Sequence, residues 1–499
     1  MDILGCGCCK ACQPRYKRLV DSIYPAYPEM GLVKSNMQKL TFYAISHPEK
    51  LDRIGDYLAN KLSRDIYRLR IGFVRLSVEA MDSLLAACHG SPSLNLFVES
   101  FLKVIQKLLE TQQPDFEIMA TDSFVGFANI QEDTPSYHRR YDFFISKFSS
   151  LCHNCHPANS IKSKLRGAGI KGLRGVVRKT VSDDLQANIW EKQHMEKIIP
   201  SLLFNMHDGM SRIKVRCLVL QDNISQKNLN LRILIILQWN LLNDAASHSG
   251  IDSIDARRNI FSSDENADEM PLSLADSCLR ELIGKASFGN MKGVLQPVLN
   301  HFDNHRLWFG CPPTFAIACF EIIMYSIQAQ YSYFVIQLVI NHLDLHSDDD
   351  VDIRLGIATV LSRIVLIATN TSIGPTLLEI FNSMLRHLRQ SVDMQFNSTD
   401  SLSDDTERQY QETLINTMGD FANNLPDYQK VEIMLFIIGK VPTHGGRQAE
   451  SFLLKVLVRT LLKVATKYRT GHLATVLSPS FLEPLLRLAL NDDSCVRLL

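Results

Sequence analysis

The chain has 499 residues, of which 46% are hydrophobic, 21% charged and 8% aromatic. This composition supplies enough apolar surface for a core and excludes a largely disordered chain, and the length favours two or three lobes or one repeat array. The 53 basic residues balance 53 acidic ones, which excludes a polycationic protein that binds nucleic acid through its overall charge. The charge is unevenly distributed, because residues 1–200 hold 27 basic against 21 acidic residues and residues 201–499 hold 26 against 32.

The N-terminal segment combines cysteines with basic residues. Short cysteine-rich termini beside lysine and arginine are typical of S-palmitoylation, and two acyl chains, or one chain plus basic residues, hold a protein on a bilayer. Asp2 stands where N-myristoylation requires glycine. The alternatives are a thiolate zinc site, for which adjacent Cys8 and Cys9 lack the usual paired spacing, and a terminus without function. The candidate lipidation residues are Cys6, Cys8, Cys9 and Cys12, and the candidate anionic-lipid contacts beside them are Lys10, Arg15, Lys17 and Arg18.

The chain shows no pattern of a secretory signal or a membrane-spanning helix. Its longest apolar stretch, residues 231–242, is interrupted by polar side chains and is shorter than the roughly 20 residues needed to span a bilayer. The remaining cysteines are too scattered for a secreted disulfide scaffold. We therefore expect a protein that is cytosolic or faces the cytosol.

Helical periodicity predominates along the chain. In residues 94–109 the apolar positions recur at steps of three and four, and the same pattern returns in residues 315–343, 375–388, 431–438 and 452–465. Alternating β-branched runs joined by tight turns are not evident. The sequence predicts an all-α protein.

A weak repeat suggests how the helices are arranged. Asp350 precedes Arg354 by four residues, and Asp493 precedes Arg497 in the same way, a pattern that opens the second helix of antiparallel helix-pair repeats; residues 114–117 show a looser version. We expect an α-solenoid, an elongated right-handed stack of HEAT/armadillo-like antiparallel helical repeats. The alternative is an ordinary large helical domain whose helices begin with aspartate.

The composition also suggests where the domains begin and end. Residues 1–20 read as a cysteine-rich basic membrane anchor, and residues 21–249 as a first helical-repeat block. Residues 250–271 read as an acidic and polar linker. Residues 272–499 read as a second block with a polar loop at about residues 391–411.

A second basic run contains no acidic residue from position 143 to 182. On a solenoid it would form a positive face for anionic lipid, the alternative being a solvated helix face. Aromatic residues are not interleaved with the charges, which argues against nucleic acid. The residues are Lys162, Lys164, Arg166, Lys171, Arg174, Arg178 and Lys179.

Two further patterns imitate cofactor or phosphate-binding motifs. The Cys152–His156 segment matches a haem attachment pattern, but a single match in an all-α chain is weak. Residues 167–172 imitate part of a phosphate loop, with Leu173 where lysine is required. Neither a serine nucleophile elbow nor a His-Glu-x-x-His motif occurs. We therefore predict no catalytic residue, no metal site and no cofactor.

Several long segments resemble one known family, the EFR-three homologue (rolling blackout) family of plasma-membrane scaffolds. They include residues 39–44 (KLTFYA), 130–144 (IQEDTPSYHRRYDFF), 200–206 (PSLLFNM), 323–331 (IMYSIQAQY) and 424–429 (NLPDYQ). The resemblance implies a rod of helical repeats with palmitoylated N-terminal cysteines, on the cytoplasmic face of the plasma membrane with a cytosolic pool. It also implies recruitment of phosphatidylinositol 4-kinase type III alpha through a tetratricopeptide-repeat adaptor, in support of phosphatidylinositol 4-phosphate synthesis.

Two departures bear on this resemblance. Residues 223–244 do not fit the family pattern, and family members continue well beyond Leu499 toward the region that holds their adaptor contacts. A different function attributed to the family is a serine-dependent diacylglycerol lipase, for which a nucleophile, a base and an acid would be required. The scaffold is the primary interpretation and the lipase is the alternative.

Overall fold

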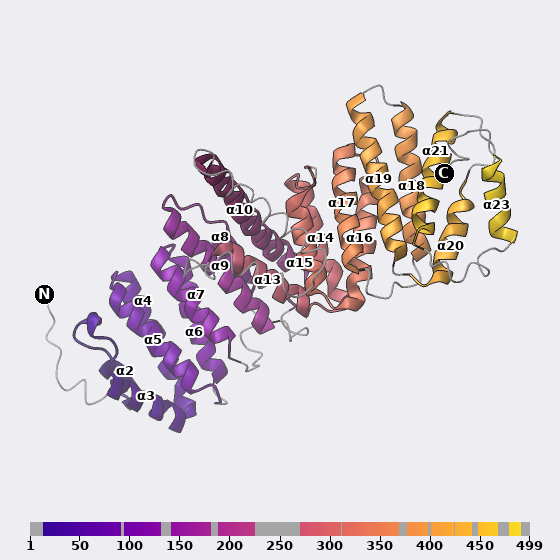
Figure 1. Ribbon diagram of the computed structural model, residues 1–499. Helices are drawn as coiled ribbons and strands as arrows, with labels where there is room; N and C mark the ends of the chain where they lie inside the picture. The colour runs from indigo at the N-terminus through magenta and orange to yellow at the C-terminus, as the bar shows by residue number, and fades with distance from the viewer. Residues whose placement is uncertain are drawn as a thin grey trace. The chain divides into compact units, whose positions relative to one another are not determined.

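The computed structural model describes residues 13–90, 94–130, 141–180, 188–224, 270–310, 312–368, 377–397, 401–423, 425–441, 448–467 and 479–490. Within these residues the chain forms 19 α-helices and three short 3-10 helices, and no strand (Figure 1). The helices fall into two compact units, residues 1–285 and residues 286–499. The predicted all-α class is confirmed.

The first unit is a stack of helices in two layers. Its elements are α2 (Arg15–Ser22), η1 (Pro28–Met30), α3 (Lys34–Ser46), η2 (Pro48–Lys50), α4 (Leu51–Tyr67), α5 (Ile71–Ala87), α6 (Leu94–Glu110), α7 (Pro114–Ala128), α8 (Tyr141–Cys152), α9 (Asn159–Thr180), α10 (Lys192–Ile224) and α13 (Pro271–Lys285). Most helices contact both the next helix and the next but one; α4, for example, packs on α5 and α6, and α7 on α9. This pattern, visible as parallel rows in Figure 1, is that of an α-solenoid.

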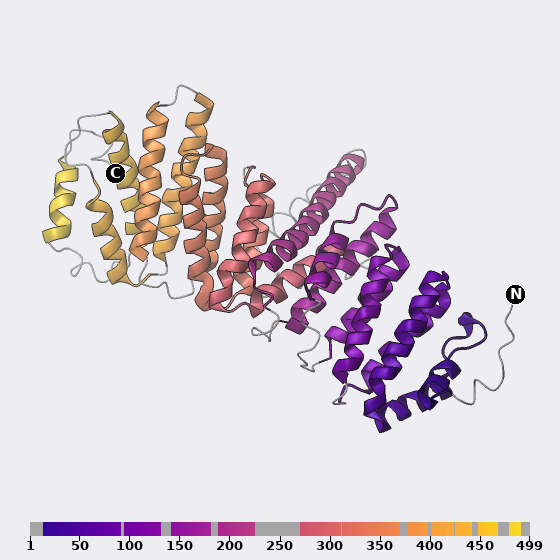
Figure 2. The same ribbon diagram turned by 180° about the vertical axis from the view of Figure 1, so that it is seen from behind.

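The second unit repeats the same arrangement. Its elements are α14 (Phe288–Asn304), α15 (Thr314–Ser326), η5 (Ala329–Tyr331), α16 (Ser332–Leu345), α17 (Val351–Ala368), α18 (Leu377–Asn397), α19 (Ser401–Asn423), α20 (Asp427–Ile438), α21 (Gln448–Ala465) and α23 (Pro479–Ala489). Here α15 packs on α17, α16 on α18, and α17 on α19, and the view from behind in Figure 2 shows the orange helices of this unit side by side. The predicted solenoid is therefore confirmed in each unit.

The apolar periodicity predicts the helix faces correctly. In α6 all eight apolar positions of the predicted face are buried: Leu94, Phe97, Val98, Phe101, Leu102, Ile105, Leu108 and Leu109. Two predicted helix starts are also confirmed, since α7 begins at Pro114 and α17 begins directly after Asp350. The matching motif at residues 493–497 lies outside the described residues.

One predicted run is two helices. Residues 315–343 show unbroken periodicity, but α15 ends at Ser326 and the backbone of Ile327 is extended, with φ −73° and ψ 160°. The side chain of Ile327 is nevertheless buried, so the apolar pattern continues across the break. Periodicity alone therefore does not mark the helix end.

The polar loop predicted at residues 391–411 is wrong for most of its length. Residues 391–397 belong to α18 and residues 401–411 to α19, which leaves only residues 398–400 outside the described chain. Ser391, Glu407 and Gln411 are buried; the Ser391 hydroxyl donates to the Glu407 carboxylate at 2.5 Å and accepts from the Gln411 amide at 3.1 Å. Part of the segment's polar side chains thus forms a buried contact between two helices.

The predicted boundary near residue 271 also needs adjustment. Residues 250–269 lie outside the described residues, and α13, which follows them, packs on α9 and α10 within the first unit. The second unit begins one helix later, at residue 286. Among the described helices, none combines the length and apolarity needed to cross a bilayer.

Candidate membrane-contact site

The predicted lipidation residues lie at the edge of what the structure describes. Cys6, Cys8, Cys9, Cys12 and Lys10 fall outside the described residues, which begin at position 13. Acylation of the four thiols and lipid contact by Lys10 therefore remain predictions.

The three basic residues that follow are gathered on α2. Arg15 and Arg18 are exposed, and Lys17 is half-buried. The guanidinium carbon of Arg15 lies 5.3 Å from the ring centroid of Tyr43, and the Lys17 ammonium lies 5.4 Å from that of Tyr57. These cation–π contacts fasten α2 to α3 and α4 while its charges stay near the surface. The structure thus brings the predicted residues together directly after the cysteine segment.

The second basic run lies on α9, but several of its charges are used inside the fold. Arg174 and Arg178 both pair with Glu281 of α13, at 2.7 and 2.8 Å. Burial alone would raise the pKa of Glu281, but hydrogen bonds from the two arginines outweigh it and lower that pKa to about 2. The carboxylate and the two guanidinium groups therefore form a strong clamp between α9 and α13.

Two more members of the run are buried. The Arg166 guanidinium pairs with Asp208 of α10 at 2.8 Å, and the Lys179 ammonium donates to the carbonyl of Ile130 at 2.5 Å. An open basic face that includes Arg166, Arg174, Arg178 and Lys179 is therefore the wrong description of α9. The acidic partners of these arginines lie 42 to 107 residues away in the sequence, and the partner of Lys179 is a backbone carbonyl. The composition of the basic run itself therefore does not reveal these pairings.

The rest of the run stays closer to the surface. Lys164 is exposed, and Lys162 and Lys171 are half-buried. Lipid contact by these three lysines remains a prediction.

An exposed turn that sequence reasoning missed lies between α4 and α5. Residues 67–71 alternate apolar and basic side chains, Tyr-Arg-Leu-Arg-Ile, and all five are exposed. Tyr67 is 90% exposed and Leu69 is 68% exposed. Leu69 has a φ of 55°, a left-handed conformation that is costly for leucine. The signal in the sequence was this alternation outside any helical period.

A second turn lies against the first. The side chain of Pro28 touches α5 at Gly72, where an added Cβ would come within 2.6 Å of it. Tyr27 and Met30, on either side, are 69% and 73% exposed. We call the two turns together the turn surface: Tyr27, Met30, Tyr67, Arg68, Leu69, Arg70 and Ile71.

The chemistry of the turn surface suits an anionic bilayer interface. Aromatic and aliphatic side chains gain free energy when they enter the acyl boundary, and arginine heads stay in the headgroup layer. The surrounding segment is basic, with 12 lysines and arginines against 6 acidic residues between positions 13 and 75.

The possible haem or thiolate motif on α8 does not form a common site. Cys152 is buried at the end of α8, and burial raises the pKa of its thiol, whereas Cys155 is exposed. The glycine-rich segment at residues 167–172 lies inside α9, where an added Cβ on Gly172 would meet the Phe148 ring at 2.5 Å. It serves close packing of α9 on α8.

Comparison with known proteins covers the whole chain. The family model described as EFR3, armadillo repeat, matches residues 37–499. An EFR3 homolog of Caenorhabditis briggsae is 54% identical over 99% of this chain and 54% of its own length. EFR3 homolog B of Danio rerio is 48% identical over 99% of this chain and 57% of its own, and human EFR3 homolog A is 48% identical over 98% and 57%.

The chain spans about half the length of these curated relatives. A crystal structure of Efr3 is 17% identical and aligns with a TM-score of 0.49 over 97% of this chain and 82% of its own. Because the family model covers more than nine-tenths of the sequence, and because its helical repeats are those observed in both units, the chain belongs to the EFR3 armadillo-repeat family.

Proposed function

We propose that the protein is a peripheral scaffold on the cytoplasmic face of the plasma membrane. In this proposal, S-palmitoylation at Cys6, Cys8, Cys9 and Cys12 anchors the chain, and basic residues hold the first unit against anionic lipid. The scaffold recruits phosphatidylinositol 4-kinase type III alpha through a tetratricopeptide-repeat adaptor and supports synthesis of phosphatidylinositol 4-phosphate.

The observation that carries the proposal is the chemistry of the exposed surface of the first unit. Exposed arginines on α2 follow directly on the four thiols, and the turn surface adds exposed aromatic and aliphatic side chains to further arginines. Acyl chains, apolar side chains and basic charge are additive contributions to bilayer binding. Membership of the EFR3 family supports the scaffold role by resemblance.

The anchor is tested in cells. Tagged full-length protein is compared with the Cys6→Ser/Cys8→Ser/Cys9→Ser/Cys12→Ser variant by membrane fractionation. The quadruple variant should move to the cytosol, while any single replacement should have little effect because two chains suffice. Unchanged membrane residence of the quadruple variant would refute the acyl anchor.

The contribution of charge is tested with unacylated protein and vesicles of phosphatidylcholine and phosphatidylserine. Each basic residue near the surface contributes about 1 kcal/mol, so Arg68→Glu/Arg70→Glu should weaken binding at least about 30-fold. The loss should shrink as salt rises. The matched control, Arg306→Glu/Arg389→Glu, reverses two exposed arginines of the second unit. Equal losses in both variants would show that only overall charge matters.

The apolar contribution has its own matched pair. Tyr67→Ser/Leu69→Ser removes a tyrosine and a leucine from the turn surface, and Leu345→Ser/Tyr428→Ser removes an exposed leucine and an exposed tyrosine from the second unit. Only the first variant should lower vesicle binding. A third variant, Lys162→Glu/Lys164→Glu/Lys171→Glu, measures how much these three lysines of α9 contribute to vesicle binding.

Recruitment is tested separately. Tagged protein is isolated from cells, and the kinase and its adaptor are measured in the bound fraction. The proposal expects both, in proportion to the membrane-bound pool. Their absence, with anchoring intact, would leave this chain as an anchor without a recruiting surface.

A further inference from the structure

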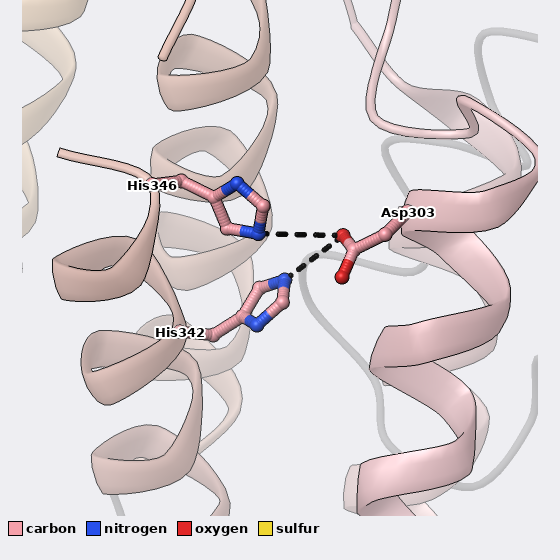
Figure 3. Close-up of side chains that lie close together, drawn as sticks. All are labelled: Asp303, His342 and His346. Atoms are coloured by element: carbon pink, nitrogen blue, oxygen red, sulfur yellow. Dashed lines mark hydrogen bonds and ion pairs between the residues drawn. The ribbon is translucent and has the colours of Figure 1, made fainter. Parts of the chain in front are cut away.

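Two histidines and an aspartate converge between α14 and α16 in the second unit. Asp303 lies in the last turn of α14, His342 lies in the last turn of α16, and His346 directly follows that helix. Both rings point toward the Asp303 carboxylate (Figure 3). The Nε2 atoms of His342 and His346 lie 3.1 and 3.5 Å from Oδ1 of Asp303.

Neighbouring groups hold two of these three residues, His346 and Asp303, in place. The Nδ1 atom of His346 lies 2.5 Å from a carboxylate oxygen of Asp349, and the indole N–H of Trp308 donates to Oδ1 of Asp303 at 2.7 Å. Burial alone would raise the pKa of Asp303, but the contacts from His342 and Trp308 outweigh it and lower the pKa. The Trp308 and His342 contacts both fall on Oδ1 and fix the orientation of the Asp303 carboxyl group.

We propose that Asp303, His342 and His346 form a binding site for a divalent zinc-type cation, with Oδ1 of the aspartate and Nε2 of each histidine as ligands. His342 is almost fully buried, whereas Asp303 and His346 are partly exposed, which leaves a route for the ion and a fourth position for water. The bound ion joins α14 to α16.

The distances suit this chemistry. Zinc bonds to imidazole nitrogen and carboxylate oxygen at about 2.0–2.2 Å, so neighbouring donors of a tetrahedral site lie about 3.3 Å apart. The observed 3.1 and 3.5 Å lie on either side of that value, and all three donor atoms lie within 4.8 Å of one another. Little movement is needed to admit an ion.

The contact between His346 and Asp349 has a specific meaning in a metal site. A ligating histidine usually gives its other ring N–H to a carboxylate, which fixes the tautomer and makes the free nitrogen a better ligand. Asp349 occupies that place for His346. The competing explanation is that the two histidines only form hydrogen bonds to Asp303. That arrangement would not need Asp349, and the experiment must distinguish it from metal binding.

The experiment measures zinc binding to the full chain. The parent carries Cys6→Ser/Cys8→Ser/Cys9→Ser/Cys12→Ser, because those thiols would bind zinc themselves. Equilibrium dialysis against buffered zinc is run on the parent, on His346→Gln and on Asp349→Asn. His346→Gln should lose one equivalent of zinc, and Asp349→Asn should bind it about 10- to 100-fold more weakly. The control His305→Gln, an exposed histidine outside the cluster, should bind as the parent does.

A second measurement places the ion. The ring centroid of Trp308 lies 5.6 Å from that of His342, so Co²⁺ bound at this site should quench the fluorescence of this indole in the parent but not in His346→Gln. Equal zinc stoichiometry and affinity in the parent, His346→Gln and Asp349→Asn would overturn the proposal. A loss caused by His305→Gln would do the same. If His346→Gln does not fold, as judged by circular dichroism, Asp349→Asn decides.

Discussion

Arg354 links three successive parts of the second unit. Its Nε donates to the backbone carbonyl of Asp349 at 3.0 Å, directly before α17. Its guanidinium pairs with Glu407 of α19 and lies 5.1 Å from the ring centroid of Tyr410. Both charged side chains are buried, so each is held in the fold by the other.

Arg166 makes the same set of contacts in the first unit. Its Nε donates to the carbonyl of Asn154 at 2.9 Å, and its guanidinium pairs with Asp208 of α10. The ring of Phe204, 5.0 Å away, takes the place that Tyr410 has beside Arg354. A loop carbonyl, an acid on a following helix and an aromatic ring thus define a recurring arginine position of this solenoid.

Removing this arginine should be costly. Arg354→Ala leaves the Glu407 carboxylate buried without its partner, which destabilises a protein by about 3–5 kcal/mol. Arg354→Lys should recover little, because lysine lacks the planar fork that reaches both the carbonyl and the acid. The urea midpoint of the second unit measures the loss. The exposed Arg389→Ala is the control and should change stability by no more than about 0.5 kcal/mol. Equal midpoints would disprove the assigned role.

At the scale of elements, α9 is the most closely packed helix of the first unit. Gly169 and Gly172 bring it against α8, where an added Cβ on Gly169 would meet the carbonyl oxygen of Phe148 at 2.7 Å. On its other side, the Glu281 clamp attaches α13. The position of α9 therefore depends on glycines that allow close packing on one side and on ion pairs on the other.

Alanine substitution separates these effects. Gly172→Ala should destabilise the first unit by about 1–3 kcal/mol, because overpacking against Phe148 exceeds the gain in helix propensity. Gly126→Ala on α7 has nothing within 4 Å and should stabilise by about 0.4–1 kcal/mol. Thermal unfolding measures both. A stabilised Gly172→Ala would mean that α9 and α8 move apart readily.

The Glu281 clamp predicts a pH dependence. The folded pKa of Glu281 is about 2, below the ordinary 4.5. Its stabilising contribution is therefore complete above about pH 4.5 and is lost as the pH falls toward 2. Glu281→Gln should lower the urea midpoint at pH 7, and the difference from wild type should shrink between pH 4.5 and 2. Glu379→Gln, an exposed glutamate, is the control. A difference that stays constant with pH would exclude the carboxylate as its source.

Across the whole molecule, the contact pattern between successive helices makes stability local. Each repeat contacts its neighbours, so a defect should spread only a short distance. Arg354→Ala should therefore increase amide hydrogen exchange in α17 and α19 and leave α4 to α6 unchanged. Exchange followed by mass spectrometry measures this, and an equal loss of protection in both units would contradict it.

The sequence predicts well those features that depend on residues within one helix. The buried face of α6, the start of α7 at Pro114 and the start of α17 after Asp350 all follow from spacing within one helix. What it does not predict depends on distant partners. Within residues 391–411, for example, the burial of Glu407 depends on its ion pair with Arg354, 53 residues earlier in the chain.

The same reason explains the candidate sites. Arg174 and Arg178 look like a lipid-binding face until α13 brings Glu281 to them. Asp303 and His342 are separated by 39 residues, and only the packing of α14 beside α16 makes them one cluster. Periodicity describes how a helix is buried, but pairings between repeats require the register of the stack.

The left-handed backbone of Leu69 implies a conflict between stability and binding. A leucine in this conformation costs about 1–2 kcal/mol that glycine would not, and its exposed side chain returns little of that in the folded protein. Selection for stability alone would favour glycine at this position. Leu69→Gly should therefore fold at least as stably as the natural chain and bind vesicles more weakly. Under the proposed membrane function, contact of the Leu69 side chain with lipid would offset the cost of this strained turn.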